Sequence, residues 1–134
     1  MTDSAEIPVE TRAGFTVIRP SARLGGMEAD SLAAILEPLV RQKNPLILID
    51  LTNVNYIGSR SIGVLLAARG EADRQKGRII LGNVTPDVAR VLQLARLEGY
   101  FQIVNDVDEM LARSQRIIEQ KERPSPGAPT GSGQ

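Results

Sequence analysis

The sequence predicts an α/β fold: one domain with a mostly parallel four- to five-stranded sheet, an N-terminal hairpin and about four helices. After the hairpin, strand-like segments alternate with amphipathic helical segments, as right-handed crossovers in a parallel sheet require. Residues 46–51 are apolar except at Asp50, which suits a central strand buried on both faces. The length of 134 residues is that of one domain.

The first half of the chain predicts a hairpin, a helix and the central strand. Two β-prone runs, 7–10 and 15–19, flank a turn at Gly14. A helix follows, because apolar residues recur at i, i+3, i+4, i+7 and i+8. These residues are Leu32, Ile35, Leu36, Leu39 and Val40. Pro38 lies inside this pattern and predicts a kink or a shortened turn. After the central strand, residues 53–59 are predicted to form a loop.

The second half predicts three more helices separated by short strands. The first carries Ile62, Leu65, Leu66 and Ala72 on one face and ends at Lys76-Gly77. A buried strand spans 78–81. Thr85 is then an N-cap and Pro86 the first residue of a helix. A strand at 100–104 leads to a last helix capped by Asp106. The residues expected to face the core from the last two helices are Val88, Val91, Leu92, Ala95, Met110, Leu111, Ile117 and Ile118.

Composition excludes several classes of function. The 16 Lys and Arg residues equal the 16 Asp and Glu residues, which disfavours nucleic acid as a partner. The chain has no Cys and no His, so disulfides, thiolate or imidazole catalysis and Cys/His metal sites are excluded. We expect no metal and no cofactor. No apolar run approaches about 18 residues and no signal peptide is visible at the N-terminus, which predicts no membrane insertion and a cytoplasmic location.

The two ends differ in composition from the rest of the chain. We expect a flexible N-terminus over residues 1–6, a folded domain over 7–121 and a disordered tail over 122–134. The tail is rich in Pro, Gly and Ser and offers nothing to anchor a core.

The segment 57–63 is the main candidate for function. It lies where the carboxyl edge of a buried parallel strand meets a long helix, the place where open α/β sheets put their sites. Ser59 is expected at or near the N-cap, where backbone N–H groups and the helix dipole stabilise an anion. A phosphoryl group there would change the surface and preserve the fold. The alternative is that Ser59 only caps the helix. Asp50, the Gly25-Gly26 pair and the acidic residues 106–109 are interpreted as structural.

From about residue 7 to residue 113 the chain resembles STAS domains, the anti-sigma factor antagonist family. In that family a strand ends in Asp-Leu, and a D-S-[ST]-G-L-G segment then opens a helix. Positions that match the family pattern are Asp50, Leu51, Gly77, Asn83, Pro86, Val91, Leu92 and Leu97. Within the D-S-[ST]-G-L-G segment only Ser59 and Gly63 are kept, so the phosphorylation motif is divergent. Gly58 replaces its Asp, and Arg60, Ser61 and Ile62 replace the next three residues.

The resemblance implies a non-catalytic regulator in a partner switch. Such an antagonist binds an anti-sigma factor that is also a serine kinase, is inactivated when that kinase phosphorylates its serine, and is restored by a phosphatase. The resemblance places Ser59 at the phosphoacceptor position. The residues expected to contact the partner are Gly58, Ser59, Arg60, Ser61, Ile62, Val64 and Leu65.

Two other functions remain open at this point. A degenerate STAS module could act as a constitutive scaffold, or as a subunit of a signalling or lipid-transport complex. An exposed apolar patch around Val64, Leu65 and Ala68 would favour that role. A small enzyme using Asp50 and Ser59 is disfavoured, because the sequence pattern supplies no base to activate the serine.

Overall fold

The computed structural model describes residues 7–122, which contain a five-stranded sheet. Its strands are β1 (Val9–Arg12), β2 (Phe15–Ile18), β4 (Leu46–Asp50), β6 (Arg78–Gly82) and β7 (Gln102–Val104), in the spatial order β1-β2-β4-β6-β7. β1 is antiparallel to β2, and every other neighbouring pair is parallel. The predicted α/β class, the N-terminal hairpin and the mostly parallel sheet are confirmed.

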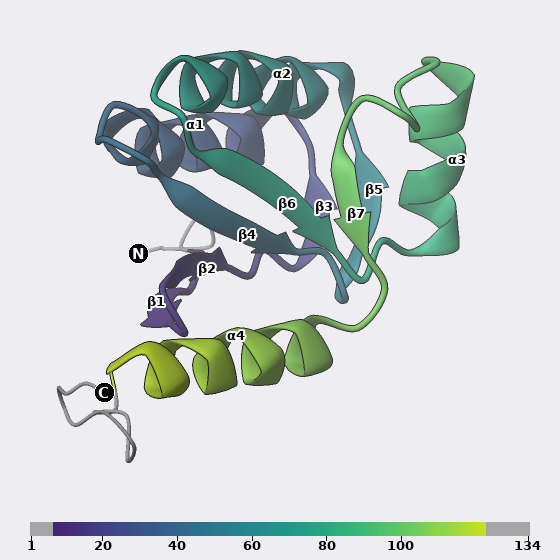
Figure 1. The fold of residues 1–134 in the computed structure, drawn as a ribbon. Helices are drawn as coiled ribbons and strands as arrows, with labels where there is room; N and C mark the ends of the chain where they lie inside the picture. The colour runs from purple at the N-terminus through teal and green to yellow at the C-terminus, as the bar shows by residue number, and fades with distance from the viewer. Residues whose placement is uncertain (1–6, 123–134) are drawn as a thin grey trace, which may run out of the picture.

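Helices lie on both faces of this sheet (Figure 1). α1 (Gly26–Val40) and α2 (Ser59–Arg74) lie side by side on one face, and α4 (Val107–Glu122) covers the other. α3 (Pro86–Leu94) packs beside a second, two-stranded parallel sheet formed by β3 (Ala22–Leu24) and β5 (Val54–Ile57). α4 runs to Glu122, one residue into the segment predicted as a tail; residues 1–6 and 123–134 lie outside the described part of the chain.

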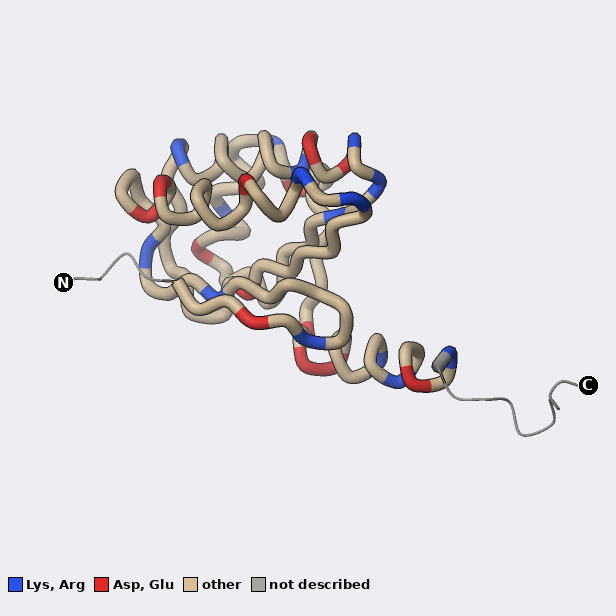
Figure 2. Tube along the Cα trace, turned by 90° about the vertical axis from the view of Figure 1, so that its left-hand side faces the viewer, with Lys and Arg blue, Asp and Glu red and all other residues tan. Residues whose placement is uncertain are grey.

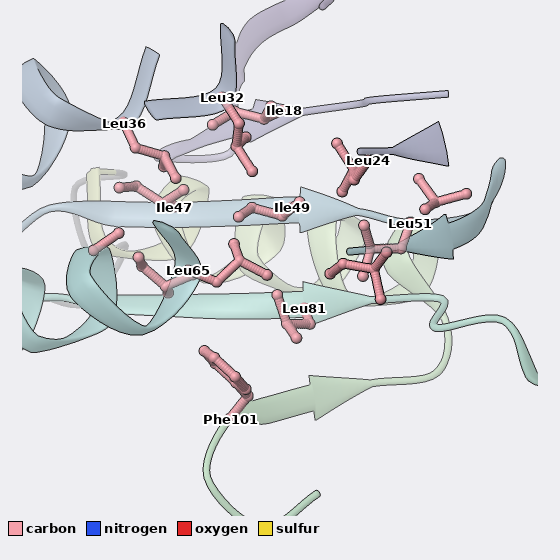
Figure 3. Close-up of a cluster of buried hydrophobic side chains, with 14 of the residues drawn as sticks. Ile18, Leu24, Leu32, Leu36, Ile47, Ile49, Leu51, Leu65, Leu81 and Phe101 are labelled. Carbon is pink, nitrogen blue, oxygen red and sulfur yellow. The ribbon is translucent and has the colours of Figure 1, made fainter. Parts of the chain in front are cut away.

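Alternate residues of the central strand supply two separate cores. Ile47 and Ile49 point toward α1 and α2, where they join a large aliphatic cluster with Leu32, Leu65 and others (Figure 3). Leu48 points the other way and packs in a smaller cluster under α4. This smaller cluster consists of Phe15, Val17, Leu48, Ile80, Val107 and Leu111. The central strand is therefore buried on both faces, as its apolar run predicts.

The predicted helix caps are confirmed by hydrogen bonds. The Thr85 hydroxyl accepts from the Val88 N–H at 3.5 Å, and the Asp106 carboxylate accepts from the Glu109 N–H at 3.0 Å. α1 continues through Pro38 to Val40. Two residues expected in the core are exposed instead. Ala95 follows the end of α3, and Ile117 lies on the outer side of α4, where it is 51% exposed.

No strand was predicted at 20–26, and the prediction of a loop at 53–59 was wrong in part. Each segment contains a strand, β3 and β5 respectively, and the two strands pair with each other. Their pairing brings the chain that enters α1 next to the chain that enters α2. This small sheet positions the candidate site.

Candidate functional site

The candidate site is the surface around Ser59, the first residue of α2. Gly58 is the N-cap, and its backbone N–H donates to the Leu24 carbonyl at 2.8 Å. β3 and β5 also align Arg23 with Tyr56. Ser59 itself is exposed. A hydroxyl at this place is open to a partner protein, and its position at the start of a helix favours a negative charge.

The starts of α1 and α2 are joined by two further contacts. The buried Ser61 hydroxyl donates to the Gly25 carbonyl at 3.3 Å, which fixes the first turn of α2 against the entry to α1. On the surface, the Arg60 guanidinium forms an ion pair with the Asp30 carboxylate of α1. At the start of α1, the Glu28 carboxylate accepts from the Gly25 N–H at 3.0 Å.

An arginine and a tyrosine cover the other side of Gly58. The guanidinium carbon of Arg23 lies 4.4 Å from the centroid of the Tyr56 ring, a cation–π contact. A Cβ built on Gly58 would lie 3.3 Å from the Tyr56 hydroxyl oxygen. In the family pattern an Asp stands at this position. Here the Tyr56 ring lies beside the glycine at the N-cap, and Arg23 stacks on that ring.

The seven residues expected to bind a partner do not all reach the surface. Ser59 and Arg60 are exposed, and Gly58, Ile62 and Val64 are partly buried. Ser61 and Leu65 are fully buried, so the expectation that their side chains contact a partner does not fit the structure. Both lie on the face of α2 that packs inward, together with Ala68 and Ala72. They hold the helix in place under the exposed residues.

Sequence reasoning missed the neighbours that the small sheet and α1 bring to Ser59. Arg23, Asp30 and Tyr56 surround the start of α2 through the contacts given above, and Met27, in the first turn of α1, is 66% exposed. Tyr, Met and Arg are enriched in protein interfaces. The β-prone run Val54–Ile57 was the available signal, since a strand there implies a pairing partner.

Asp50 has a structural environment, as interpreted from the sequence. Its carboxylate is buried, accepts from the Thr52 N–H at 3.0 Å and the Thr52 hydroxyl at 2.5 Å, and pairs with the Arg19 Nε at 3.2 Å. Arg19 also binds Glu10, and the hydrogen bond from Arg19 lowers the pKa of that carboxyl. Bonds to Glu10 and Asp50 raise the pKa of Arg19. Asp50 is therefore committed to joining the hairpin to the end of β4.

Basic and acidic residues are intermixed over the layer of α1 and α2 (Figure 2). Within residues 7–122, no three Asp or Glu side chains gather to hold a metal ion, and no helix has the length and apolarity to cross a membrane. A groove of about 320 Å³ runs between α1 and α2 on their outer side. Its lining includes Leu36, Val40, Val64 and Ala68, with Glu37, Arg41, Glu71 and Arg74 around them.

Known proteins of one family are similar to this chain in sequence or in fold. A STAS-domain containing protein of Pseudomonas aeruginosa is 34% identical over 55 residues, which are 41% of this chain and 54% of that protein, so the match spans about half the relative's length. The anti-sigma-factor antagonist (STAS) domain protein of Planctomyces limnophilus has the same fold, with a TM-score of 0.70 and 24% identity over 81% of this chain and 97% of that one. The phosphorylated Bacillus cell fate determinant SpoIIAA gives a TM-score of 0.63 at 22% identity, covering 81% and 98% of the two chains. The family model for the STAS domain matches residues 6–110, and the chain belongs to the STAS domain family.

Proposed function

We propose that this protein is a non-catalytic regulator that binds an anti-sigma factor with serine kinase activity, in a cytoplasmic partner switch controlled at Ser59. The observation that carries the proposal is the exposure of Ser59 at the first residue of α2 in a STAS domain. The fold shared with anti-sigma-factor antagonists, one of them phosphorylated, supports it. Further groups that could contact a protein partner lie around Ser59: the exposed side chains of Arg60 and Met27, and the stacked pair Arg23–Tyr56.

The chemistry of the switch needs a nucleoside triphosphate, which the kinase would bind. The Ser59 hydroxyl oxygen forms a bond to the γ-phosphorus, the bond from that phosphorus to the bridging oxygen breaks, and the nucleoside diphosphate leaves. The hydroxyl proton passes to a base of the kinase. A phosphatase reverses the change by transferring the phosphoryl group to water.

The added phosphoryl group alters binding without altering the fold. It carries about −1.5 to −2 charges at neutral pH, and the start of a helix accommodates them. A partner that packs against a neutral hydroxyl would then meet a dianion at the centre of the contact. Desolvating that charge without a matching cation costs binding free energy.

An exposed apolar patch around Val64, Leu65 and Ala68 would favour the constitutive scaffold, and the structure does not have it. Leu65 and Ala68 are buried, and Val64 is half-buried. The enzyme alternative lacks support too, since Asp50 is bound to Thr52 and Arg19.

The first experiment is intact-mass analysis with site mapping of the protein isolated from its native cells. We expect one phosphoryl group on Ser59 under some growth or stress conditions, and none in a Ser59→Ala strain. A Ser114→Ala strain is the matched control and should keep the modification, because α4 lies on the opposite face of the sheet from α2. An unmodified Ser59 in every condition would contradict the switch.

The second experiment measures binding to the kinase that co-purifies with the protein. Ser59→Asp is expected to weaken the complex at least tenfold, with an unchanged far-UV circular dichroism spectrum. Ser114→Asp is the control, since α4 lies on the opposite face of the sheet from α2. Equal affinity for the unmodified protein and the Ser59→Asp variant would remove Ser59 from the interface.

A further inference from the structure

We propose that a phosphoryl group on Ser59 takes Arg60 away from Asp30, so that modification of α2 also changes the surface of α1. This inference rests on the proposed function in one respect, namely that Ser59 accepts the phosphoryl group. It adds an internal exchange of ion pairs between two helices. The exchange requires no partner protein and no movement of the backbone.

The existing ion pair is placed where it can be exchanged. Arg60 is the second residue of α2, and Asp30 lies in the second turn of α1. Their side chains are 64% and 67% exposed. An ion pair this exposed contributes about 0–1 kcal/mol, because water screens it and two long side chains must be ordered. Arg60 can therefore leave Asp30 at little cost.

The phosphoryl group would be the stronger competitor for Arg60. It is attached to the neighbouring residue, whose Cα is about 3.8 Å away along the chain. It carries nearly twice the charge of a carboxylate, and its oxygens match the fork of an Arg guanidinium. Gly26 lies beside the Arg60 guanidinium and has no side chain to hold it: a Cβ there would lie 3.6 Å from an Arg60 terminal nitrogen.

The other charged groups around Ser59 are committed elsewhere. Arg23 lies over the Tyr56 ring, and Glu28 accepts the Gly25 N–H in the first turn of α1. Arg60 is the guanidinium on the residue next to Ser59, and it can exchange one anion for another at modest cost. Its transfer would leave the Asp30 carboxylate exposed and unpaired. A partner lying across the starts of both helices would then meet new negative charge on α1 as well as on α2.

The test uses the full-length protein with phosphoserine inserted at position 59 during translation. The probe is the phosphate itself, followed by phosphorus NMR during a pH titration. A free phosphoserine has its second pKa at about 6. A bound guanidinium favours the dianion and lowers that pKa. We expect Arg60→Gln to raise the phosphate pKa by about 0.3 or more, since a direct ion-pair partner of a phosphate shifts its titration measurably.

Two further variants separate the exchange from general electrostatics. Asp30→Asn should lower the phosphate pKa, because it removes the competing anion, and this effect should largely disappear in the Arg60→Gln background. Arg69→Gln is the matched control on the same helix, and it should leave the phosphate pKa unchanged because Arg69 lies about 15 Å further along α2, where salt screens its charge. An unchanged pKa in Arg60→Gln overturns the inference. So does an effect of Asp30→Asn that persists in full without Arg60, since it would then be simple charge repulsion.

Failure of this inference can be told apart from failure of the proposed function. The phosphoserine is inserted by translation, so the titration gives an answer whether or not a kinase exists. Native protein that is never phosphorylated would contradict the switch and leave the titration result standing. A modified native protein with no pKa change in Arg60→Gln would keep the switch and overturn the exchange.

Discussion

At the scale of single residues, the buried carboxylate of Asp50 is held by hydrogen bonds within the fold and is not available for chemistry. One Asp50 oxygen accepts two bonds from Thr52, and the other binds the Arg19 Nε. The Thr52 hydroxyl also accepts from the Asn83 amide at 2.8 Å, and the Asn83 side-chain oxygen accepts the Val107 N–H at 3.2 Å. A chain of hydrogen bonds therefore runs from the hairpin, past the ends of two strands, to the start of α4.

We predict that Asp50→Asn lowers the free energy of unfolding by about 1–3 kcal/mol, the usual cost of leaving a buried polar group without its partner. The amide keeps the shape of the carboxylate, but its NH₂ group would face the Arg19 Nε, and two donors cannot bond. Urea denaturation followed by circular dichroism measures the change. Asp73→Asn is the control, because Asp73 is exposed and its loss should change stability by less than about 0.5 kcal/mol. Equal stabilities for the two variants would contradict the role given to Asp50.

At the scale of elements, sequence patterns predicted the helices and the central strands well and the small sheet poorly. Repeated apolar spacing marks α1, and the continuous apolar run marks β4. β3 and β5 have three and four residues, and each is stabilised by the other across about 30 residues of chain. Such pairing is a tertiary contact that no local pattern contains. Arg23 and Tyr56 were missed for this reason, whereas Ser59, placed by a strand–helix junction, was found.

The buried face of α2 differs from the predicted one for a related reason. The residues of α2 that are buried are Ser61, Leu65, Ala68 and Ala72. A pattern of apolar residues cannot predict that a serine is buried, and it assigns the half-buried Ile62 to the core instead. The burial of Ser61 depends on the Gly25 carbonyl, which accepts its hydroxyl, and that acceptor comes from another segment.

We predict opposite effects from two glycine-to-alanine changes, one in the C-terminal part of α2 and one just after the helix. A Cβ on Gly70, inside α2, would meet nothing within 4 Å, so Gly70→Ala should stabilise the protein by about 0.5–1 kcal/mol through helix propensity. A Cβ on Gly77 would lie 2.1 Å from the Pro45 carbonyl oxygen. Gly77→Ala should therefore destabilise by about 1–3 kcal/mol, as overpacking does. Thermal unfolding followed by circular dichroism measures both; a shift of the two melting temperatures in the same direction would contradict the packing described.

At the scale of the whole molecule, the sheet separates the candidate site from α4. The large core under α1 and α2 carries the surface around Ser59, and the smaller core holds α4 on the other face (Figure 1). The sheet backbone lies between the two cores, and no side chain belongs to both. α4 should therefore be able to loosen without disturbing the start of α2.

Gly82→Ala tests this independence, because Gly82 lies at the end of β6 directly under the first residue of α4. A Cβ there would come within 2.3 Å of a Val107 methyl carbon and 3.3 Å of a Leu48 methyl carbon. Val107 therefore has to move. Because Val107 is the first residue of α4, we expect amide hydrogen exchange in α4 to become at least tenfold faster. Exchange in the buried turns of α1 and α2 should stay within a factor of about three, because local opening in one unit leaves other units protected. Faster exchange throughout both helical layers would mean that the two cores unfold as one unit. In that case α4 would be required to hold the start of α2, and a change at α4 would reach Ser59 through the sheet.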